Sequence, residues 1–150
     1  ETKKNSLEAS VLNVWQKAVE QTQEITDNAQ MLKNPEQINL GYGEPYRNFI
    51  FVEDMMDVWK TVITSHEKCN NGLKFTIGPD NPIQIKDYVD MIAKKIGWSG
   101  KVNWNTKPKR PGEIYWLNSN SLLVEKTLGW SPKTSLDTGL DKTIDIWKNN

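Results

Sequence analysis

Short apolar segments alternate with amphipathic helical segments along most of this chain, and this alternation constrains the fold more than any other feature. The pattern predicts strands at residues 37–40, 48–52, 73–77 and 101–105, and helices over residues 53–65, 85–96, 121–128 and 136–147. A further helix is predicted from Leu7, where apolar residues recur at spacings of three and four. Strands that alternate with helices indicate an α/β domain.

The segments 48–52 and 73–77 lie on either side of one predicted helix. Parallel strands need a long crossover connection, so this β–α–β order predicts that the two segments form a parallel pair. Residues that end or cap helices support the predicted boundaries. Gly97 and Gly129 stop two helices, and Ser135 caps the last one.

The charge balance excludes several classes of function. The chain has 19 basic and 19 acidic residues, so we expect no general attraction to nucleic acid or to an anionic membrane. No apolar run reaches 18 residues, and the N-terminus has no stretch of the signal-peptide type. Cys69 is the only cysteine, which excludes an internal disulfide framework. We therefore expect a cytoplasmic protein without a membrane partner.

Two arginines are candidates for a local anion site. Arg47 lies in a loop that leads directly into the apolar segment 48–52, and Arg110 lies between Pro108 and Pro111. Arginine can donate two hydrogen bonds at once to a phosphate, which lysine does less well. From the residues alone, a solvated loop arginine is the favoured explanation of Arg47, and a solvated basic loop with Lys107 and Lys109 explains Arg110.

Three segments in a fixed order carry a resemblance to a known family. Residues 41–54 read GYGEPYRNFIFVED, residues 75–78 and 82–85 read FTIG and PIQI, and residues 110–113, 128–132 and 135–140 read RPGE, LGWSP and SLDTGL. In this order they resemble the extended short-chain dehydrogenases/reductases. Members of that family are NAD(P)-dependent epimerases and dehydratases that act on nucleotide sugars. The similarity covers residues 37–150.

The resemblance implies that the chain is the C-terminal part of an extended Rossmann-type α/β enzyme. Residues 37–80 would form a β–α–β unit at the sheet edge with its parallel strand pair. Residues 81–150 would form a small mixed α/β substrate-binding lobe. The ligand implied is a nucleotide-diphosphate sugar, with Arg47 and Arg110 holding the diphosphate and Glu113 accepting hydrogen bonds from the ribose hydroxyls.

The chain departs from the family pattern in two respects that concern the cofactor. It has no Gly-rich dinucleotide fingerprint, and no tyrosine is followed four residues later by lysine. We therefore expect no catalytic residue and no bound cofactor in this chain alone. NAD or NADP would bind mainly to an N-terminal half that the chain lacks, and that half or a second copy would be its protein partner. Two alternatives remain open, a non-catalytic nucleotide-sugar-binding module and a structural or interaction domain.

Other side chains that could carry chemistry have structural interpretations. Glu53, Asp54 and Asp57 begin a predicted helix, where capping and the helix dipole explain them. One histidine and one cysteine cannot supply a three-ligand zinc site, so we expect no metal. For Tyr115 and Trp116 we expect core packing of at least one ring and assign no ligand role.

Overall fold

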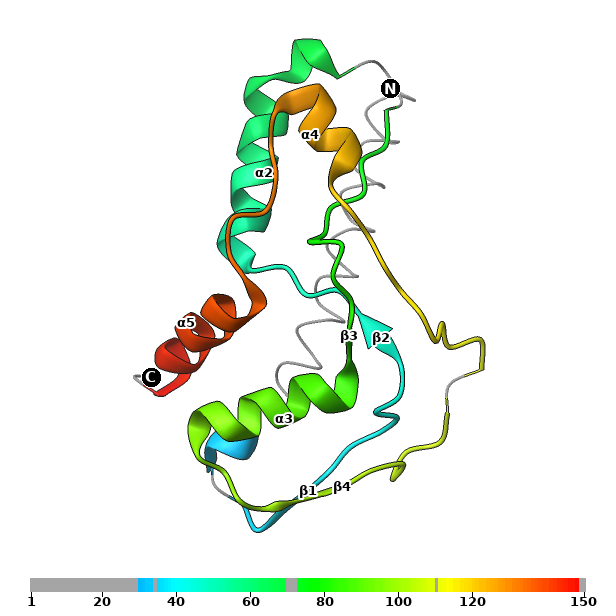
Figure 1. The fold of residues 1–150 in the computed structure, drawn as a ribbon, viewed down its shortest axis with the longest axis vertical. Coiled ribbons are helices and arrows are strands. Elements are labelled where there is room, and N and C mark those ends of the chain that lie inside the picture. Colours follow the sequence, from blue (N-terminus) through cyan, green and yellow to red (C-terminus); the bar gives the residue numbers. More distant parts are fainter. Residues whose placement is uncertain (1–29, 34, 70–72, 110, 149–150) are drawn as a thin grey trace, which may run out of the picture.

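The computed structural model describes residues 30–33, 35–69, 73–109 and 111–148 (Figure 1). The helix predicted from Leu7 and the side chain of Arg110 lie outside these residues. The elements are η1 (Gln30–Lys33), β1 (Gln37–Asn39), β2 (Tyr46–Arg47), α2 (Val52–Thr64), η2 (His66–Lys68), β3 (Ile83–Gln84), α3 (Ile85–Ile96), β4 (Lys101–Asn103), α4 (Leu122–Leu128) and α5 (Leu136–Lys148).

The four predicted helices within the described residues are confirmed, with ends that lie within one residue of the predicted ones. Gly97 and Gly129 adopt left-handed conformations with φ of 72° and 70°, which glycine reaches without steric cost. Ser135 caps α5, because its hydroxyl oxygen accepts a hydrogen bond from the Thr138 N–H at 3.1 Å. The local sequence therefore sets the ends of α3 and α4 and the start of α5.

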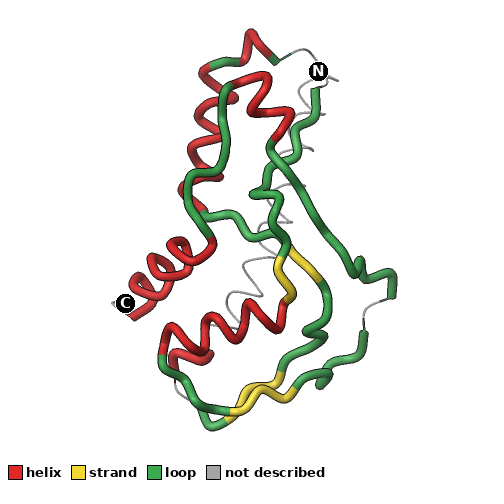
Figure 2. Tube along the Cα trace, in the orientation of Figure 1, coloured by secondary structure: helices red, strands yellow, loops and turns green. Residues whose placement is uncertain are grey.

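The strands form two short pairs. β1 and β4 are parallel, with Ile38 opposite Val102, and β2 and β3 are antiparallel, with Tyr46 opposite Gln84. In Figure 2 the parallel pair lies at the lower end of the molecule and the antiparallel pair near its middle. The α/β class with a parallel strand pair is thus confirmed, but the pair is β1 with β4.

The predicted strands at 48–52 and 73–77 are wrong. Both segments lack assigned strand structure, although Ile50, Phe75 and Ile77 pack against buried residues as their apolar pattern suggests. Polar groups near the second segment bond to residues 120 and 121 instead of forming a ladder: Thr76 Oγ1 donates to the Asn120 carbonyl at 3.0 Å, and the Gly78 N–H donates to Ser121 Oγ at 3.1 Å. An apolar pattern predicts that side chains are buried, but it does not predict whether the backbone pairs with another strand.

Two hydrophobic clusters form the core. The α3 cluster contains Met31, Ile38, Leu40, Tyr88, Val89, Ile92, Trp98 and Leu140. The α2–α4 cluster contains Val58, Val124 and Trp130. Figure 1 shows α2 and α4 side by side at one end and α3 with β1 and β4 at the other, so β2 and β3 lie between the two clusters. Among the described residues, no helix has both the length and the apolar character to cross a membrane.

Candidate functional site

The parallel pair β1·β4 brings two loops to one edge. The carboxyl ends of parallel strands meet at the same edge, which is where ligands bind in open α/β sheets. The loop after β1 and the loop after β4 start out joined: the Asn105 N–H donates to the Gly41 carbonyl at 2.9 Å, and the Thr106 N–H donates to the Leu40 carbonyl at 3.1 Å. The fold therefore places the segments that carry the predicted site residues next to each other.

The two loops remain in contact further along. The Lys109 Nζ lies 5.1 Å from the centre of the Tyr42 ring, within the range of a cation–π contact. Arg47 Nη2 lies 3.7 Å from Glu113 Oε1. The structure thus brings Arg47 and Glu113 together. It does not describe Arg110, which follows Lys109 directly and precedes Glu113 by three residues.

The segment that contains Glu113 runs beside β2. We call residues 111–121 the strap. The Tyr46 N–H donates to the Tyr115 carbonyl at 2.8 Å, and the Leu117 N–H donates to the Tyr46 carbonyl at 3.1 Å, so Tyr46 and Trp116 form a parallel bridge. β2 is consequently held by β3 on one side and by the strap on the other, which fixes the backbone that carries Arg47.

The Arg47 side chain is held in one orientation. Its Nη1 donates to the carbonyl oxygens of Tyr46 at 2.8 Å and Ile114 at 2.9 Å, and only 16% of the side chain is exposed. The paired Glu113 side chain is 22% exposed. Both N–H groups of Nη1 are used by carbonyls, so Nη2 and Nε carry the donors that remain for an anion. An anion bound there would share the guanidinium with the Glu113 carboxylate.

Two buried acceptors lie close to Arg47 in the sequence. Asn48 is 8% exposed, and its Nδ2 donates to the Ser119 carbonyl at 3.1 Å. Asn48 Oδ1 and Glu44 Oε2 are buried atoms without a hydrogen-bond partner among the described residues. This bond requires the amide of Asn48, because an ionised carboxylate could not donate to the Ser119 carbonyl.

The carboxylates at the start of α2 have structural partners. Asp54 Oδ2 accepts hydrogen bonds from the backbone N–H of Thr134 at 2.8 Å and of Lys133 at 3.3 Å. Asp57 Oδ2 accepts hydrogen bonds from Lys133 Nζ at 3.1 Å and from Trp130 Nε1 at 3.0 Å. The bond from Lys133, followed by that from Trp130, lowers the pKa of Asp57 below its usual value. These groups tie α2 to the segment before α5.

Metal ligands do not gather in the part of the chain that the structure describes. No group of three or more histidine, cysteine, aspartate or glutamate side chains there could hold a metal ion. His66 pairs with Glu67 at 3.7 Å, and both side chains are largely exposed. This pair has the character of a solvated helix end.

The expectation that Tyr115 or Trp116 packs in the core is wrong. Tyr115 is 54% and Trp116 55% exposed, because the strap pairs with β2 through its backbone and the described residues leave both rings largely uncovered. The Trp116 ring packs on the Tyr46 ring, with their centres 4.5 Å apart. The sequence signal was present as a run of four apolar residues beside a proline-rich loop, but such a run does not distinguish core from surface.

Known proteins resemble the chain in sequence and in fold. The family model described as GDP-mannose 4,6 dehydratase matches residues 14–143. GDP-L-fucose synthase 1 of Arabidopsis thaliana is 32% identical over 112 residues, which make up 73% of this chain and 32% of that protein. The chain thus spans about a third of the length of the curated relatives it matches.

Two solved structures show the same fold. UDP-glucose 4-epimerase from Thermotoga maritima with UDP-glucose superposes with a TM-score of 0.72 at 22% identity, over 84% of this chain and 39% of that one. dTDP-glucose 4,6-dehydratase from Bacillus anthracis in complex with NAD gives a TM-score of 0.70 at 18% identity, over 82% and 38%. The chain belongs to the GDP-mannose 4,6 dehydratase family, within the epimerases and dehydratases of the extended short-chain dehydrogenases/reductases.

Proposed function

We propose that this chain is the nucleotide-diphosphate-sugar-binding portion of an NAD(P)-dependent sugar-nucleotide epimerase or 4,6-dehydratase of the cytoplasm. The observation that carries the proposal is the guanidinium of Arg47, held by two carbonyls with donors left over, at the meeting point of two loops. The names of the relatives refer to GDP- and UDP-linked sugars, and one of the solved neighbours is a complex with UDP-glucose. A diphosphate is common to all of these ligands.

Arg47 would bind the diphosphate through Nη2 and Nε. Because its Nη1 is already fixed by the carbonyls of Tyr46 and Ile114, little side-chain entropy is lost when a phosphate binds. Arg110 would approach the same phosphates. Its neighbours in sequence support this role, because Lys109 contacts Tyr42 in the loop after β1 and Glu113 contacts Arg47 in β2.

Glu113 would have two functions in turn. Without ligand it lies beside Arg47 and compensates the charge of the guanidinium. With ligand, the phosphates compensate that charge, and the carboxylate can then accept hydrogen bonds from the ribose hydroxyls. The buried oxygens of Asn48 and Glu44 that have no partner among the described residues are further acceptors near this point.

The described strands and loops do not fit the dinucleotide cofactor. A dinucleotide binds where a glycine-rich turn leads from a strand into a helix N-terminus. Here β1 is followed by the loop to β2, and β4 by the loop to the strap. The contribution we assign to the chain is therefore binding energy, which holds the sugar in place for chemistry carried by the N-terminal half of the parent enzyme. That half, or a second copy in a homodimer, would be the protein partner of this chain.

Calorimetry with GDP- and UDP-sugars tests the proposal. The chain should bind at least one of them, and Arg47→Ala should weaken binding by about 10- to 100-fold, because a charge-assisted hydrogen bond is lost. Lys126→Ala is the matched control, since it removes an exposed cation on α4 far from the loops. Equal affinities for wild type and Arg47→Ala would refute the assignment. Turnover by the chain alone would refute the role limited to binding.

A further inference from the structure

We propose that Gln84 is a positioning residue for Arg47, which it holds in place through the loop after β1. This inference rests on the proposed function and concerns the same diphosphate site. Three consecutive carbonyl oxygens of the loop accept hydrogen bonds from three consecutive residues at the point where β3 leads into α3. Each bond is 2.9 Å long, and the donors and acceptors are the Lys86 N–H with Gly43, Gln84 Nε2 with Glu44, and the Ile85 N–H with Pro45. We call these three bonds the loop clamp.

The loop clamp uses donors that the start of a helix normally leaves free. The first N–H groups of an α-helix have no partner within the helix, and a capping side chain or an anion often accepts from them. In α3 the loop carbonyls accept from the N–H groups of Ile85 and Lys86. Gln84 occupies the cap position but makes no side-chain bond to the helix, and its amide donates to the loop. The start of α3 therefore holds the loop.

Close packing gives the clamped loop little room to move. A Cβ at Gly43 would lie 2.9 Å from ring carbons of Trp104 and 3.2 Å from the Lys86 Cβ. The helix on the other side of the loop clamp is itself anchored, because α3 contributes buried residues to the α3 cluster. The loop clamp thus connects the loop after β1 to the larger core.

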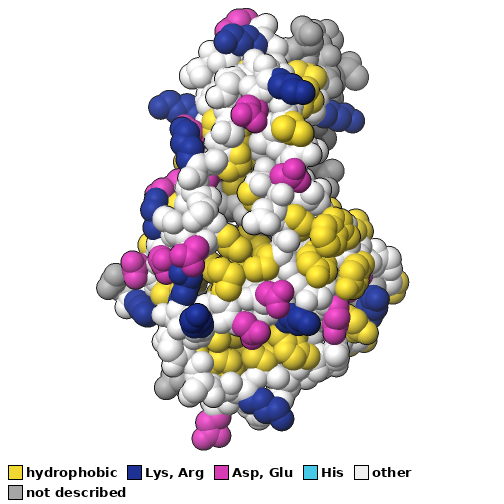
Figure 3. Space-filling model, in the orientation of Figure 1, with side chains coloured by type: hydrophobic (Ala, Val, Ile, Leu, Met, Phe, Trp, Pro, Cys, Tyr) yellow, Lys and Arg dark blue, Asp and Glu magenta, His cyan; other side chains and the backbone are white. Residues whose placement is uncertain are grey.

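The position of Arg47 depends on this loop because only Tyr46 lies between them. Tyr46 is opposite Gln84 in the β2·β3 pair, and its carbonyl accepts from Arg47 Nη1 at 2.8 Å. A shift of the loop would therefore move a carbonyl that orients the guanidinium. In Figure 3 basic and acidic side chains are interspersed over the viewed face, so no broad positive field there replaces well-placed donors. Affinity for a diphosphate then depends on how accurately a few donors are held.

Calorimetry on the full chain with GDP and UDP tests the role of Gln84. Gln84→Met keeps a long side chain but removes the donor to the Glu44 carbonyl, and it should weaken binding by about 3- to 10-fold. Gln84→Glu should weaken binding at least as much, because an ionised carboxylate cannot donate. Val124→Ala is the control, since it lowers stability in the α2–α4 cluster away from the loop and should leave the affinity unchanged.

Two further measurements distinguish positioning from a general loss of stability. In a double-mutant cycle, Gln84→Met should weaken binding in the wild-type chain but have no further effect in the Arg47→Ala background, because it acts through the guanidinium. In acid the carboxyl group introduced by Gln84→Glu becomes protonated and can donate again. Its loss of affinity relative to wild type should therefore shrink as the pH falls toward about 4, whereas the loss in Gln84→Met should stay constant.

The outcomes separate this inference from the proposed function. If Arg47→Ala weakens binding and Gln84→Met does not, the positioning role is overturned and the diphosphate site stands. Equal losses from Gln84→Met with and without Arg47 would also overturn it, because the glutamine would then act independently of the guanidinium. If Arg47→Ala leaves the affinity unchanged, or if wild type binds neither nucleotide, the proposed function fails and the positioning role fails with it.

Discussion

The two ends of the molecule differ in how they are held together. The α3 cluster has eight buried residues that come from η1, β1, α3, α5 and the loops beside them. The α2–α4 cluster has three, and α2 leaves Val52, Met56 and Ile63 exposed on its other side. Polar bonds supplement the smaller cluster, because Asp54 and Asp57 tie α2 to the segment that leads into α5.

This difference bears on the position of the site. The loops that lead to Arg47 in β2 and to Glu113 start at β1 and β4, which pack on the larger α3 cluster. A charged group that must bind a ligand in one geometry benefits from rigid support. The α2–α4 end contributes less to the site, and its exposed apolar stripe is consistent with a chain that spans about a third of its relatives. The loops after β1 and β4 that lead to the candidate site are therefore supported by the larger of the two clusters, the α3 cluster.

The largest expected effect comes from the same valine-to-alanine substitution made once in each cluster. Val89 and Val124 are both almost fully buried, one in each cluster. Val89→Ala should lower the free energy of unfolding by roughly 2–3 kcal/mol, because the surrounding α3 cluster cannot close the cavity. Val124→Ala should cost roughly 1–2 kcal/mol, because the smaller cluster can relax around the lost methyl groups. Urea unfolding of both variants measures the difference.

A reversed order would break the comparison. If Val124→Ala costs as much as Val89→Ala or more, the α2–α4 end is packed as rigidly as the α3 end. Measuring the nucleotide affinity of Val89→Ala and Val124→Ala adds a second comparison of the two clusters. We expect Val89→Ala to affect binding more, because it lies in the cluster that supports β1.

The next effect concerns the carboxylates that replace apolar packing at the α2 end. Asp54 is buried, so Asp54→Asn should cost about 1–2 kcal/mol through weaker bonds to the Lys133 and Thr134 N–H groups. Asp57→Asn removes a more exposed partner of Lys133 and should cost less. Thermal unfolding of the two variants at neutral pH gives the comparison. Equal losses of stability in the two variants would show that the burial of Asp54 does not strengthen the contact between α2 and the segment before α5.

The contribution of Asp57 to stability should depend on pH, which provides a second test of its contact with Lys133. Its pKa is lowered in the folded chain, so its contribution to stability is complete above the unfolded value of 3.8. That contribution is lost as the pH falls through the lower folded pKa. The stability difference between wild type and Asp57→Asn should therefore shrink in acid. A difference that stays constant there would mean that the Lys133 contact is not formed in solution.

The sequence predicted local features better than long-range ones. The ends of α3 and α5 followed from Gly97 and Ser135, because caps depend on residues within one turn. The absence of strands at 48–52 and 73–77 did not follow, since pairing depends on a partner from elsewhere in the chain. Ser121 shows the limit of local prediction: it directly precedes α4, but its hydroxyl bonds to Gly78 and not to the helix.

The candidate site was predicted in part for the same reason. The motifs identified Arg47 and Glu113, and the structure shows that they lie 3.7 Å apart. The exposed aromatic pair was missed, because whether Trp116 is covered depends on which segment lies above the strap. A contact between β2 and a segment some 70 residues later has no local signal in the sequence.

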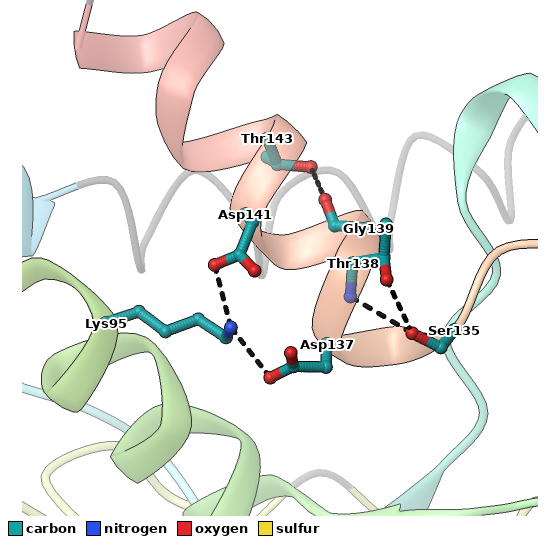
Figure 4. A network of polar contacts seen from close by, with 7 residues as sticks. All are labelled: Lys95, Ser135, Asp137, Thr138, Gly139, Asp141 and Thr143. Carbon is teal, nitrogen blue, oxygen red and sulfur yellow. Dashed lines mark hydrogen bonds and ion pairs between the residues drawn. The ribbon is translucent and has the colours of Figure 1, made fainter.

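The smallest expected effect lies at the α3 end, where one lysine connects two helices. Lys95 Nζ on α3 lies 2.7 Å from Asp137 Oδ1 and 2.7 Å from Asp141 Oδ1 on α5 (Figure 4). The bond to Asp137, followed by that to Asp141, raises the pKa of Lys95 above its usual 10.5. A raised folded pKa adds stability that is complete below the unfolded value and is lost as the pH rises through the folded one.

Lys95→Met should therefore be less stable than wild type at neutral pH, and the two should converge in alkali above pH 10.5. Lys94→Met removes an exposed neighbour on the same helix and is the matched control. Urea unfolding across the alkaline range measures both differences. Since this network joins α5 to the cluster that already has the larger core, its loss should change stability less than loss of Asp54, which supports the smaller one. The opposite ranking would mean that α5 is held to α3 by charge and not by the apolar contact of Leu140.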